Sequence, residues 1–396
     1  MSWNLEQELT TLDDRGLRRR LRTLESTQGT AVRIGGREVV NFSSNDYLGL
    51  AASEELKAAL VEGVERFGAG SGASRLVCGG LEPHRRLEEM LAAFKGTEAA
   101  IAFPSGFAVA LGTLPALLGP EDVVILDKLC HASLVDGAKM SGATLRVFPH
   151  NHMGKLEKLL AATAGARRVL VVTESVFSMD GDLALLNDIV ELKDRHGAWL
   201  LLDEAHAVGV LGPQGRGLAA ALGLEKRVEL QMGTLSKAVG LSGGYLAASR
   251  QVVDLLINRA RSFIYTSAPP PALAHAASGA LELIQGAEGE RRREKLRSNL
   301  TTMGVTGSLC SAIHPIIIGN EERAMKLSAR LLEEGFLIPA IRYPTVARGS
   351  ARLRLTLSAG HEPGQIEALA VHLRYAMAEL GAEEPAPPAL EAGEAG

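Results

Sequence analysis

The segment Val228–Ser249 reads VELQMGTLSKAVGLSGGYLAAS. An apolar run that is typical of a buried strand ends at Met232, small polar residues lead to Lys237, and a glycine-rich bend precedes a second apolar run. A lysine among small residues has room around its amine for a flat ring, as a lysine that forms Schiff bases requires. The hydroxyls of Thr234 and Ser236 suit a bound phosphate. This segment alone leaves open that Lys237 is an ordinary lysine of a surface loop.

A second segment, Ala198–Val208, reads AWLLLDEAHAV. Its apolar strand, Trp199–Leu202, ends at Asp203, and His206 follows three residues later. A carboxylate at the end of a buried strand is costly unless a cation or strong donors meet it, and a protonated pyridine nitrogen is such a cation. The alternatives that stay open are a helix-capping or turn role for Asp203 and a core position for His206.

A third segment, Ser105-Gly106-Phe107, follows the apolar run Ala99–Phe103 and opens a predicted helix. Backbone N–H groups at the start of a helix form an anion site that suits a phosphate. The three segments each follow a predicted strand, so we expect them to meet at one edge of a sheet.

Short apolar runs alternate with helical stretches from about residue 97 onward. This alternation predicts an α/β fold whose mainly parallel, seven-stranded sheet is covered by helices on both faces. Catalytic residues of such a fold belong at the carboxyl ends of the strands. The seven runs are Ala99–Phe103, Val123–Leu126, Leu145–Phe148, Val169–Val172, Trp199–Leu202, Val228–Met232 and Tyr245–Ala248.

Changes in pattern along the chain predict its domain organisation. We expect an N-terminal helix and extension over 1–45, a large domain over 46–285 and a smaller C-terminal α+β domain over 286–382. The smaller domain would begin with the charged helix Glu288–Asn299. Residues 383–396 carry no large apolar pattern and are expected to be disordered.

Composition excludes several classes of protein. The 396 residues carry a net charge of −4, so a strongly basic nucleic-acid binder is not the default expectation. Three widely spaced cysteines, Cys78, Cys130 and Cys310, predict neither a disulfide framework nor a metal site, and fit a reducing cytoplasm. We expect no membrane span and no secretion signal. No GxGxxG follows a first strand and no GxxxxGK[ST] is present, so a nucleotide-binding fold is disfavoured.

The chain resembles the α-oxoamine synthases, which are pyridoxal 5'-phosphate (PLP) enzymes of fold-type I related to class II aminotransferases. The resemblance spans nearly the whole chain. Its most specific segments are Asn41–Leu50 (NFSSNDYLGL), Thr173–Gly181 (TESVFSMDG) and Ala351–Leu357 (ARLRLTL). The others are Gly70–Gly72, Ser105–Phe107, Cys130–Leu134 (CHASL), Asp203–His206 (DEAH), Gly209–Gly217 (GVLGPQGRG), Thr234–Lys237 (TLSK) and Ile264–Pro270 (IYTSAPP).

The resemblance implies roles around the ring of the cofactor. Lys237 would form the Schiff base with PLP and later move protons at the substrate Cα. Asp203 would pair with the pyridine nitrogen, and His131 would stack on the ring. His206 and Ser178 would donate hydrogen bonds to the ring oxygen. For His131, the sequence alone leaves open a plain core position.

The resemblance also implies roles around the phosphate. The backbone amides of Gly106 and Phe107 would lie near the cofactor, and Thr234 would contact its phosphate. Thr266 would reach the phosphate of the neighbouring subunit, because these enzymes are homodimers with shared active sites.

Substrate contacts follow from the resemblance in the same way. Asn45 and Arg354 would hold the amino-acid carboxylate, and Arg18 and Thr356 would lie near the acyl substrate. The arginine assignments stay open between Arg352 and Arg354, and among Arg18, Arg19 and Arg20.

The implied activity is a decarboxylative condensation of an amino acid with an acyl thioester. Within the family, the chain most resembles the enzymes of biotin biosynthesis that join L-alanine to pimeloyl-CoA or pimeloyl-acyl carrier protein. The alternative is a member that uses glycine or serine. A PLP-binding protein without this catalysis is a second alternative, and the sequence does not choose between the two acyl carriers.

Overall fold

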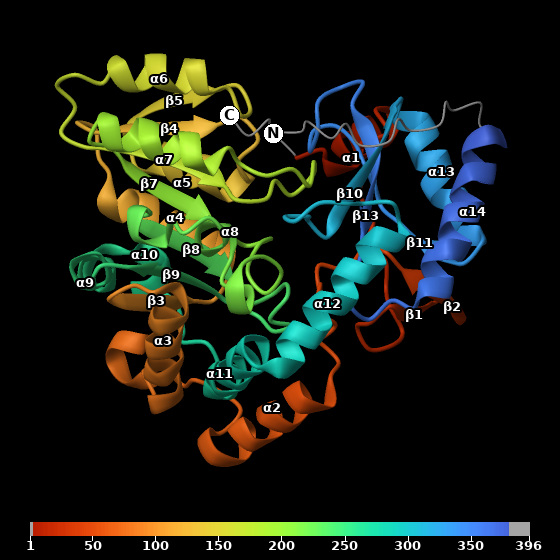
Figure 1. Ribbon diagram of the computed structural model, residues 1–396, viewed down its shortest axis with the longest axis horizontal. Coiled ribbons are helices and arrows are strands. Elements are labelled where there is room, and N and C mark those ends of the chain that lie inside the picture. The colour runs from red at the N-terminus through yellow and green to blue at the C-terminus, as the bar shows by residue number, and fades with distance from the viewer. Residues whose placement is uncertain (1–2, 380–396) are drawn as a thin grey trace. The chain divides into compact units, whose positions relative to one another are not determined.

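The computed structural model describes residues 3–379 (Figure 1). The chain forms two compact units, of which the larger contains Ser44–His314 and Thr356–Ile366. The smaller contains the residues up to Ser43, Pro315–Leu355 and the residues from Glu367 onward. The domain limits of 1–45, 46–285 and 286–382 stay predictions, and the predicted disordered tail lies outside the described residues.

The larger unit is built on a seven-stranded sheet with the order β3-β9-β8-β7-β6-β4-β5. Only β9 runs antiparallel to its neighbours, so the predicted mainly parallel sheet is confirmed. The strand β8 begins later than predicted because the short helix η3 (Glu225–Arg227) precedes it closely. The strands are β3 (Ala99–Phe103), β4 (Val123–Asp127), β5 (Thr144–Phe148), β6 (Val169–Glu174), β7 (Trp199–Asp203), β8 (Leu230–Thr234) and β9 (Gly244–Ala248).

Alternate residues of the strands contribute to two apolar layers. Leu201 belongs to a core cluster with residues of the helices α4, α5, α9 and α10 on one face. Leu200 and Leu202 are equally buried and point to the opposite face, because successive side chains of a strand alternate. The helices of this unit are α2 (Glu54–Phe67), α3 (Glu82–Lys95), α4 (Gly106–Leu117), α5 (Ala132–Met140), α6 (Met153–Ala161), α7 (Leu186–Arg195), α8 (Leu218–Ala221), α9 (Arg250–Arg259), α10 (Arg261–Ile264), α11 (Pro271–Gln285) and α12 (Ala287–Thr302), with the single turns η1 (Arg75–Gly79) and η2 (Pro213–Gly215).

The smaller unit contains two three-stranded sheets. In the first, β1 (Ala31–Ile34) and β2 (Arg37–Asn41) form a hairpin through Gly35 and Gly36, whose positive φ angles of 56° and 75° suit a tight hairpin turn. The strand β11 (Phe336–Leu337) pairs with β2 in parallel. The second sheet has the order β10-β13-β12. Its strands are β10 (Ile313–Gly319), β12 (Ala340–Ile341) and β13 (Ala351–Thr356), and the helices are α1 (Leu5–Asp14), α13 (Glu321–Glu333) and α14 (Pro363–Glu379).

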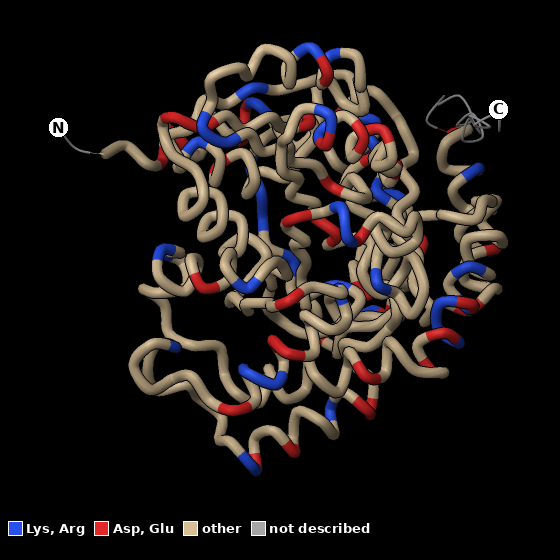
Figure 2. Tube along the Cα trace, turned by 60° about the vertical axis from the view of Figure 1, so that its left-hand side comes forward, with Lys and Arg blue, Asp and Glu red and all other residues tan. Residues whose placement is uncertain are grey.

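Charged residues of both signs are interspersed along the described trace (Figure 2). Among residues 3–379, no helix combines the length and the hydropathy that crossing a membrane would require.

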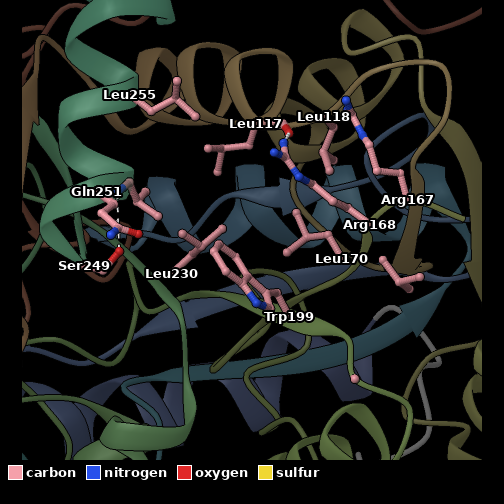
Figure 3. Close-up of a pocket in the computed structure, with 13 residues that line it drawn as sticks. Leu117, Leu118, Arg167, Arg168, Leu170, Trp199, Leu230, Ser249, Gln251 and Leu255 are labelled. Carbon is pink, nitrogen blue, oxygen red and sulfur yellow. Dashed lines mark hydrogen bonds between the residues drawn. The ribbon is translucent and has the colours of Figure 1, made fainter.

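A cavity of about 390 Å³ lies at the edge of the sheet where β6, β7 and β8 begin (Figure 3). Leucines and Trp199 form its apolar wall, and two arginines lie on one side. The Arg168 Nη1 donates to the carbonyl of Leu117 at 2.5 Å, and Arg167 is paired with Asp122. These guanidinium groups therefore bind within the protein, and the cavity is at the edge opposite to the carboxyl ends of the strands.

A buried ion pair fixes the segment that follows β7. The Lys95 ammonium, at the end of α3, contacts the carboxylate of Glu204 and also donates to the carbonyl of Arg216 at 2.5 Å. The other oxygen of Glu204 accepts the N–H of Ala219 at 3.0 Å. Both charged side chains are at most 1% exposed. The pair thus ties together α3, the end of β7 and the loop before α8.

We expect Lys95→Met to lower the free energy of unfolding by about 3–5 kcal/mol, because it leaves the buried Glu204 carboxylate without its cation. Urea denaturation at neutral pH measures the effect. The matched control is Lys57→Met, which removes an exposed pair with Glu54 and should cost less than about 1 kcal/mol. Equal losses in the two variants would contradict the structural role of the buried pair.

Candidate active site

Five loops meet at one edge of the large sheet. The strands β3, β8, β7, β6 and β4 all run in the same direction, so their carboxyl ends lie at one edge. The residues that follow these ends are Gly106, Lys237, His206, Ser178 and His131. The predicted convergence of the sequence segments is therefore a consequence of the parallel sheet.

Lys237 lies directly beside His206. The Lys237 Nζ is 2.7 Å from Nε2 of His206, whose Nδ1 is 2.5 Å from the hydroxyl of Tyr47. His206 and Tyr47 are buried, and Lys237 is partly exposed. The loop of Lys237 also packs tightly on the segment after Tyr47, since a Cβ at Gly240 would lie 2.7 Å from the backbone nitrogen of Ala51. Tyr47 was not singled out from the sequence.

Asp203 is the last residue of β7 and only 6% exposed. One of its carboxylate oxygens accepts the N–H of Ala205 at 2.9 Å, and within residues 3–379 it forms no ion pair. Burial raises the pKa of this carboxyl, and the positive charge of Lys237 only partly offsets that. A buried carboxyl without a salt bridge fits a pyridinium N–H, which would supply the missing cation.

The start of α4 and the end of β8 bring backbone N–H groups and hydroxyls close together. Ser105 caps α4 by accepting the N–H of Ala108, while the N–H groups of Gly106 and Phe107 have no acceptor in the described chain. Gly106 packs next to Thr234, whose hydroxyl donates to the carbonyl of Gly243 at 2.8 Å and lies 2.8 Å from the Ser236 hydroxyl. The two open amides at the helix start fit a phosphate group.

His131 is the N-cap residue of α5 and is exposed at the surface with part of its ring covered, so the alternative of a core histidine is wrong. Its Nδ1 accepts from the backbone N–H of Ser133 and lies 2.8 Å from that residue's hydroxyl, which leaves Nε2 to carry the ring proton. Burial of part of the ring lowers the pKa of His131, so the neutral form is favoured at pH 7.

Glu174, which the sequence reasoning missed, joins two of the predicted site residues. It ends β6 opposite Asp203 in the sheet register and is 2% exposed. Its carboxylate accepts the backbone N–H of His131 at 2.5 Å and also that of Ser178. Burial and the neighbouring Asp203 raise the pKa of Glu174 to about 8. One buried carboxyl thus holds the loops on both sides of the site.

A second group missed by the sequence reasoning, His150, bridges two carboxylates. Its Nδ1 is 3.1 Å from Asp127 and its Nε2 is 2.6 Å from Asp182, and its ring packs edge-on against Phe177. Burial alone would lower the pKa of His150, but hydrogen bonds to the two carboxylates raise it to about 10. The imidazolium, in the loop that follows β5, therefore joins the end of β4 to the loop that follows β6.

The remaining predicted residues lie in several parts of the chain. Asn45 lies in the larger unit, where the Tyr47 hydroxyl is 3.3 Å from its side-chain oxygen. Thr266 is partly exposed after α10, and Thr356 is buried at the end of β13. Arg18 and Arg354 belong to the smaller unit.

The predicted arginines differ in their surroundings. Arg18 pairs with Asp13 at 2.5 Å near the end of α1. Arg352 and Arg354 are both buried, so the alternative that they are surface charges is wrong. The Arg352 Nε donates to the carbonyl of Ser350 at 3.1 Å.

The fold and the arrangement at the sheet edge are those of a PLP-dependent transferase of fold-type I. The family model of class I and II aminotransferases matches residues 37–373, and the chain belongs to this family.

The chain is similar to proteins named 8-amino-7-oxononanoate synthase. It is 49% identical to that of Geobacter sulfurreducens, over 97% of this chain and 99% of the relative. It is 47% identical to that of Anaeromyxobacter sp. (strain K), with 96% of each chain covered.

Solved structures of two enzymes share the fold. A serine palmitoyltransferase from S. paucimobilis with a bound PLP–myriocin aldimine superposes with a TM-score of 0.88 and 31% identity, over 95% of this chain and 97% of the other. The 8-amino-7-oxononanoate synthase of Francisella tularensis gives a TM-score of 0.73 and 29% identity, over 86% and 98%.

The His150 clasp predicts a pH-dependent contribution to stability. A histidine whose pKa is raised from 6.5 to about 10 stabilises the fold fully below pH 6.5, and this contribution is lost as the pH rises through about 10. At pH 7 we expect His150→Gln to lower the free energy of unfolding by about 2 kcal/mol, as for a lost hydrogen bond to a charged group.

Urea denaturation of both proteins at neutral pH and near the raised pKa checks this expectation. The difference between wild type and His150→Gln should shrink at the higher pH. The exposed His196, at the end of α7, offers the matched control His196→Gln, which should show no such trend. A pH-independent difference for His150→Gln would argue against the imidazolium clasp.

Proposed function

We propose that this protein catalyses the PLP-dependent decarboxylative condensation of L-alanine with a pimeloyl thioester. The products are 8-amino-7-oxononanoate, CO₂ and the free thiol carrier, which is coenzyme A or acyl carrier protein. The observation that carries the proposal is the contact of Lys237 with His206 beside the buried Asp203, which forms no salt bridge within residues 3–379, in a chain whose relatives of this name match it over nearly their full length. The reaction belongs to biotin biosynthesis.

The residues of the larger unit would hold the cofactor at three points. Asp203 would meet the pyridine nitrogen, because its buried carboxyl needs a cation. The open amides of Gly106 and Phe107 would bind the phosphate, and the Thr234 hydroxyl would contact it by turning away from the carbonyl of Gly243. His206 and Ser178 would hydrogen-bond the ring oxygen. When bound, PLP withdraws electrons from the amino-acid Cα and so stabilises negative charge there.

Lys237 and His131 would perform the proton chemistry. The Lys237 Nζ would remove the Cα proton and return one after CO₂ has left, with His206 beside it as a hydrogen-bond acceptor. The new bond joins Cα to the thioester carbonyl carbon, and the carbon–sulfur bond breaks as the thiol leaves. His131 would stack on the ring, and its Nε2–H would stabilise the developing carbonyl oxyanion as a neutral donor.

Four further residues are proposed as substrate contacts. Asn45 and Arg354 would bind the alanine carboxylate, for which a planar guanidinium suits two parallel hydrogen bonds. We keep Arg354 rather than Arg352, as the resemblance of the segment Ala351–Leu357 implies. Arg18 and Thr356 would lie near the acyl chain.

We propose a homodimer in which Thr266 contacts the phosphate bound by the neighbouring subunit. Support comes from large apolar side chains exposed on η1, α4 and the end of α10, since α10 contacts both of the other elements. Val77 is 79% exposed, Tyr265 72% and Phe107 47%. Large exposed apolar side chains on neighbouring elements are typical of a protein–protein interface. The free cysteines of the described chain agree with a cytoplasmic location.

A second candidate uses serine or glycine in place of alanine. The observation that favours it is the higher TM-score to serine palmitoyltransferase, 0.88 against 0.73. A TM-score compares backbones, whereas substrate choice depends on side chains. The 49% identity to the 8-amino-7-oxononanoate synthase of Geobacter sulfurreducens therefore supports alanine more strongly.

A substrate panel tests the proposed reaction. The PLP-loaded protein is assayed for thiol release with alanine, glycine or serine, each combined with pimeloyl-CoA or acetyl-CoA. We expect the highest kcat/KM for alanine with pimeloyl-CoA. The variant Lys237→Ala should lack both turnover and the yellow colour of a lysine-bound cofactor, because only an amine forms that Schiff base. Highest activity with glycine and acetyl-CoA would reject the proposed substrates.

The proposed dimer gives a separate prediction. Val77→Lys should shift the protein from dimer to monomer in analytical ultracentrifugation, because it introduces a charge into an apolar interface. Val147→Lys, at an exposed valine of the edge strand β5, is the matched control and should stay dimeric. A dimer that withstands the change at Val77 would place the interface elsewhere.

A further inference from the structure

We propose that Tyr47 is a positioning residue that orients His206 and sets which ring nitrogen of His206 carries the proton beside Lys237. The inference rests on the proposed function for its catalytic consequence. Its structural basis is a continuous chain of four polar groups in the larger unit, formed by Lys237, His206, Tyr47 and Asn45.

The distances show that each neighbouring pair among these four polar groups is in direct contact. The Lys237 Nζ is 2.7 Å from His206 Nε2, and His206 Nδ1 is 2.5 Å from Tyr47 Oη. The same hydroxyl is 3.3 Å from Oδ1 of Asn45. Tyr47 is fully buried and His206 is 6% exposed, so solvent does not compete for these contacts.

The chemistry of the four groups determines which atom donates and which accepts in each hydrogen bond. A lysine ammonium has donors only, so His206 Nε2 accepts from Lys237 and its Nδ1 carries the ring proton. That N–H donates to Tyr47, whose own hydroxyl proton is then directed to Asn45. The Tyr47 hydroxyl is the acceptor that this Nδ1–H requires in a buried position. Phenylalanine at this position would leave the Nδ1–H without an acceptor.

The backbone around Tyr47 is held in place by hydrogen bonds from several elements. The carbonyl of Tyr47 accepts the N–H of Ala359 at 2.8 Å. The next two carbonyls accept from Arg292 of α12, at 2.9 Å and 3.1 Å. On the other side, the carboxylate of Asp46 accepts the N–H groups of Leu50 and Ala51. These bonds fix the backbone around Tyr47 independently of any bound molecule, as orientation of a catalytic histidine requires.

Tyr47→Phe removes only the hydroxyl, and the chain offers a matched control in Tyr245→Phe. Tyr245 is also fully buried in the larger unit, but its hydroxyl has no hydrogen-bond partner in the described structure. The two variants delete the same atom from the same kind of environment. They differ in whether that atom contacts His206.

The first readout uses the cofactor-free protein labelled with ¹⁵N in its histidines. Nitrogen chemical shifts of the imidazole report which nitrogen carries the proton, and loss of one signal set in His206→Asn assigns His206. We expect the Nδ1–H tautomer in the wild type and in Tyr245→Phe. We expect a gain of the Nε2–H tautomer in Tyr47→Phe. A wild-type His206 protonated at Nε2 would overturn the proposal without need of any variant.

The second readout is the kinetic constants of the PLP-loaded proteins. In Tyr47→Phe we expect kcat to fall about tenfold, which corresponds to about 1.4 kcal/mol, while KM for the amino acid changes less than about twofold. Tyr245→Phe should keep the wild-type kcat. A Tyr47→Phe protein with wild-type tautomer or wild-type kcat overturns the proposal. Failure of alanine as a substrate in the panel would reject the proposed reaction, while the tautomer measurement would still test Tyr47.

Discussion

The site depends on the burial of one carboxyl group, that of Asp203, at the end of the central strand β7. Within residues 3–379 this group has no salt bridge, and burial raises its pKa. The protein stabilises the adjoining segment by a second buried charge, Glu204, which Lys95 neutralises. Of two consecutive acidic residues, Glu204 is thus paired with a lysine, while Asp203 forms no salt bridge within residues 3–379. In the proposed site, a pyridinium ring would supply the cation that Asp203 lacks.

The parallel arrangement of the strands places further polar groups next to Asp203. Because five strands end at the same edge, the loops after them present an amine, two histidines and a helix start around Asp203. Close packing then fixes the loops. A Cβ at Gly244 would lie 2.6 Å from the backbone nitrogen of Gly106, so a larger residue there would displace the start of α4. The glycine-rich bend around Lys237 has its physical reason in this packing as much as in access for a ring.

Three further groups hold residues of the proposed site in place. Glu174 binds the backbone amides of His131 and Ser178, and His150 joins the end of β4 to the loop after β6. Tyr47 contacts His206. Each forms hydrogen bonds between segments that are distant in the sequence, so each proposed site residue is oriented by contacts outside its own loop.

The seven strands, the mainly parallel sheet and the edge at which Asp203, Lys237 and the Ser105-Gly106-Phe107 segment lie could be predicted from the sequence alone, because apolar runs and their order along the chain can be read directly from it. The supporting contacts could not be predicted, because they join distant segments of the folded chain. Tyr47 and His206 are 159 residues apart, and His131 and Glu174 are 43 apart. In the sequence Tyr47 resembles an ordinary buried aromatic residue and Glu174 a strand end. Their roles depend on which loops face one another across the sheet, and hydrogen bonds between distant loops leave no periodic pattern in a single chain.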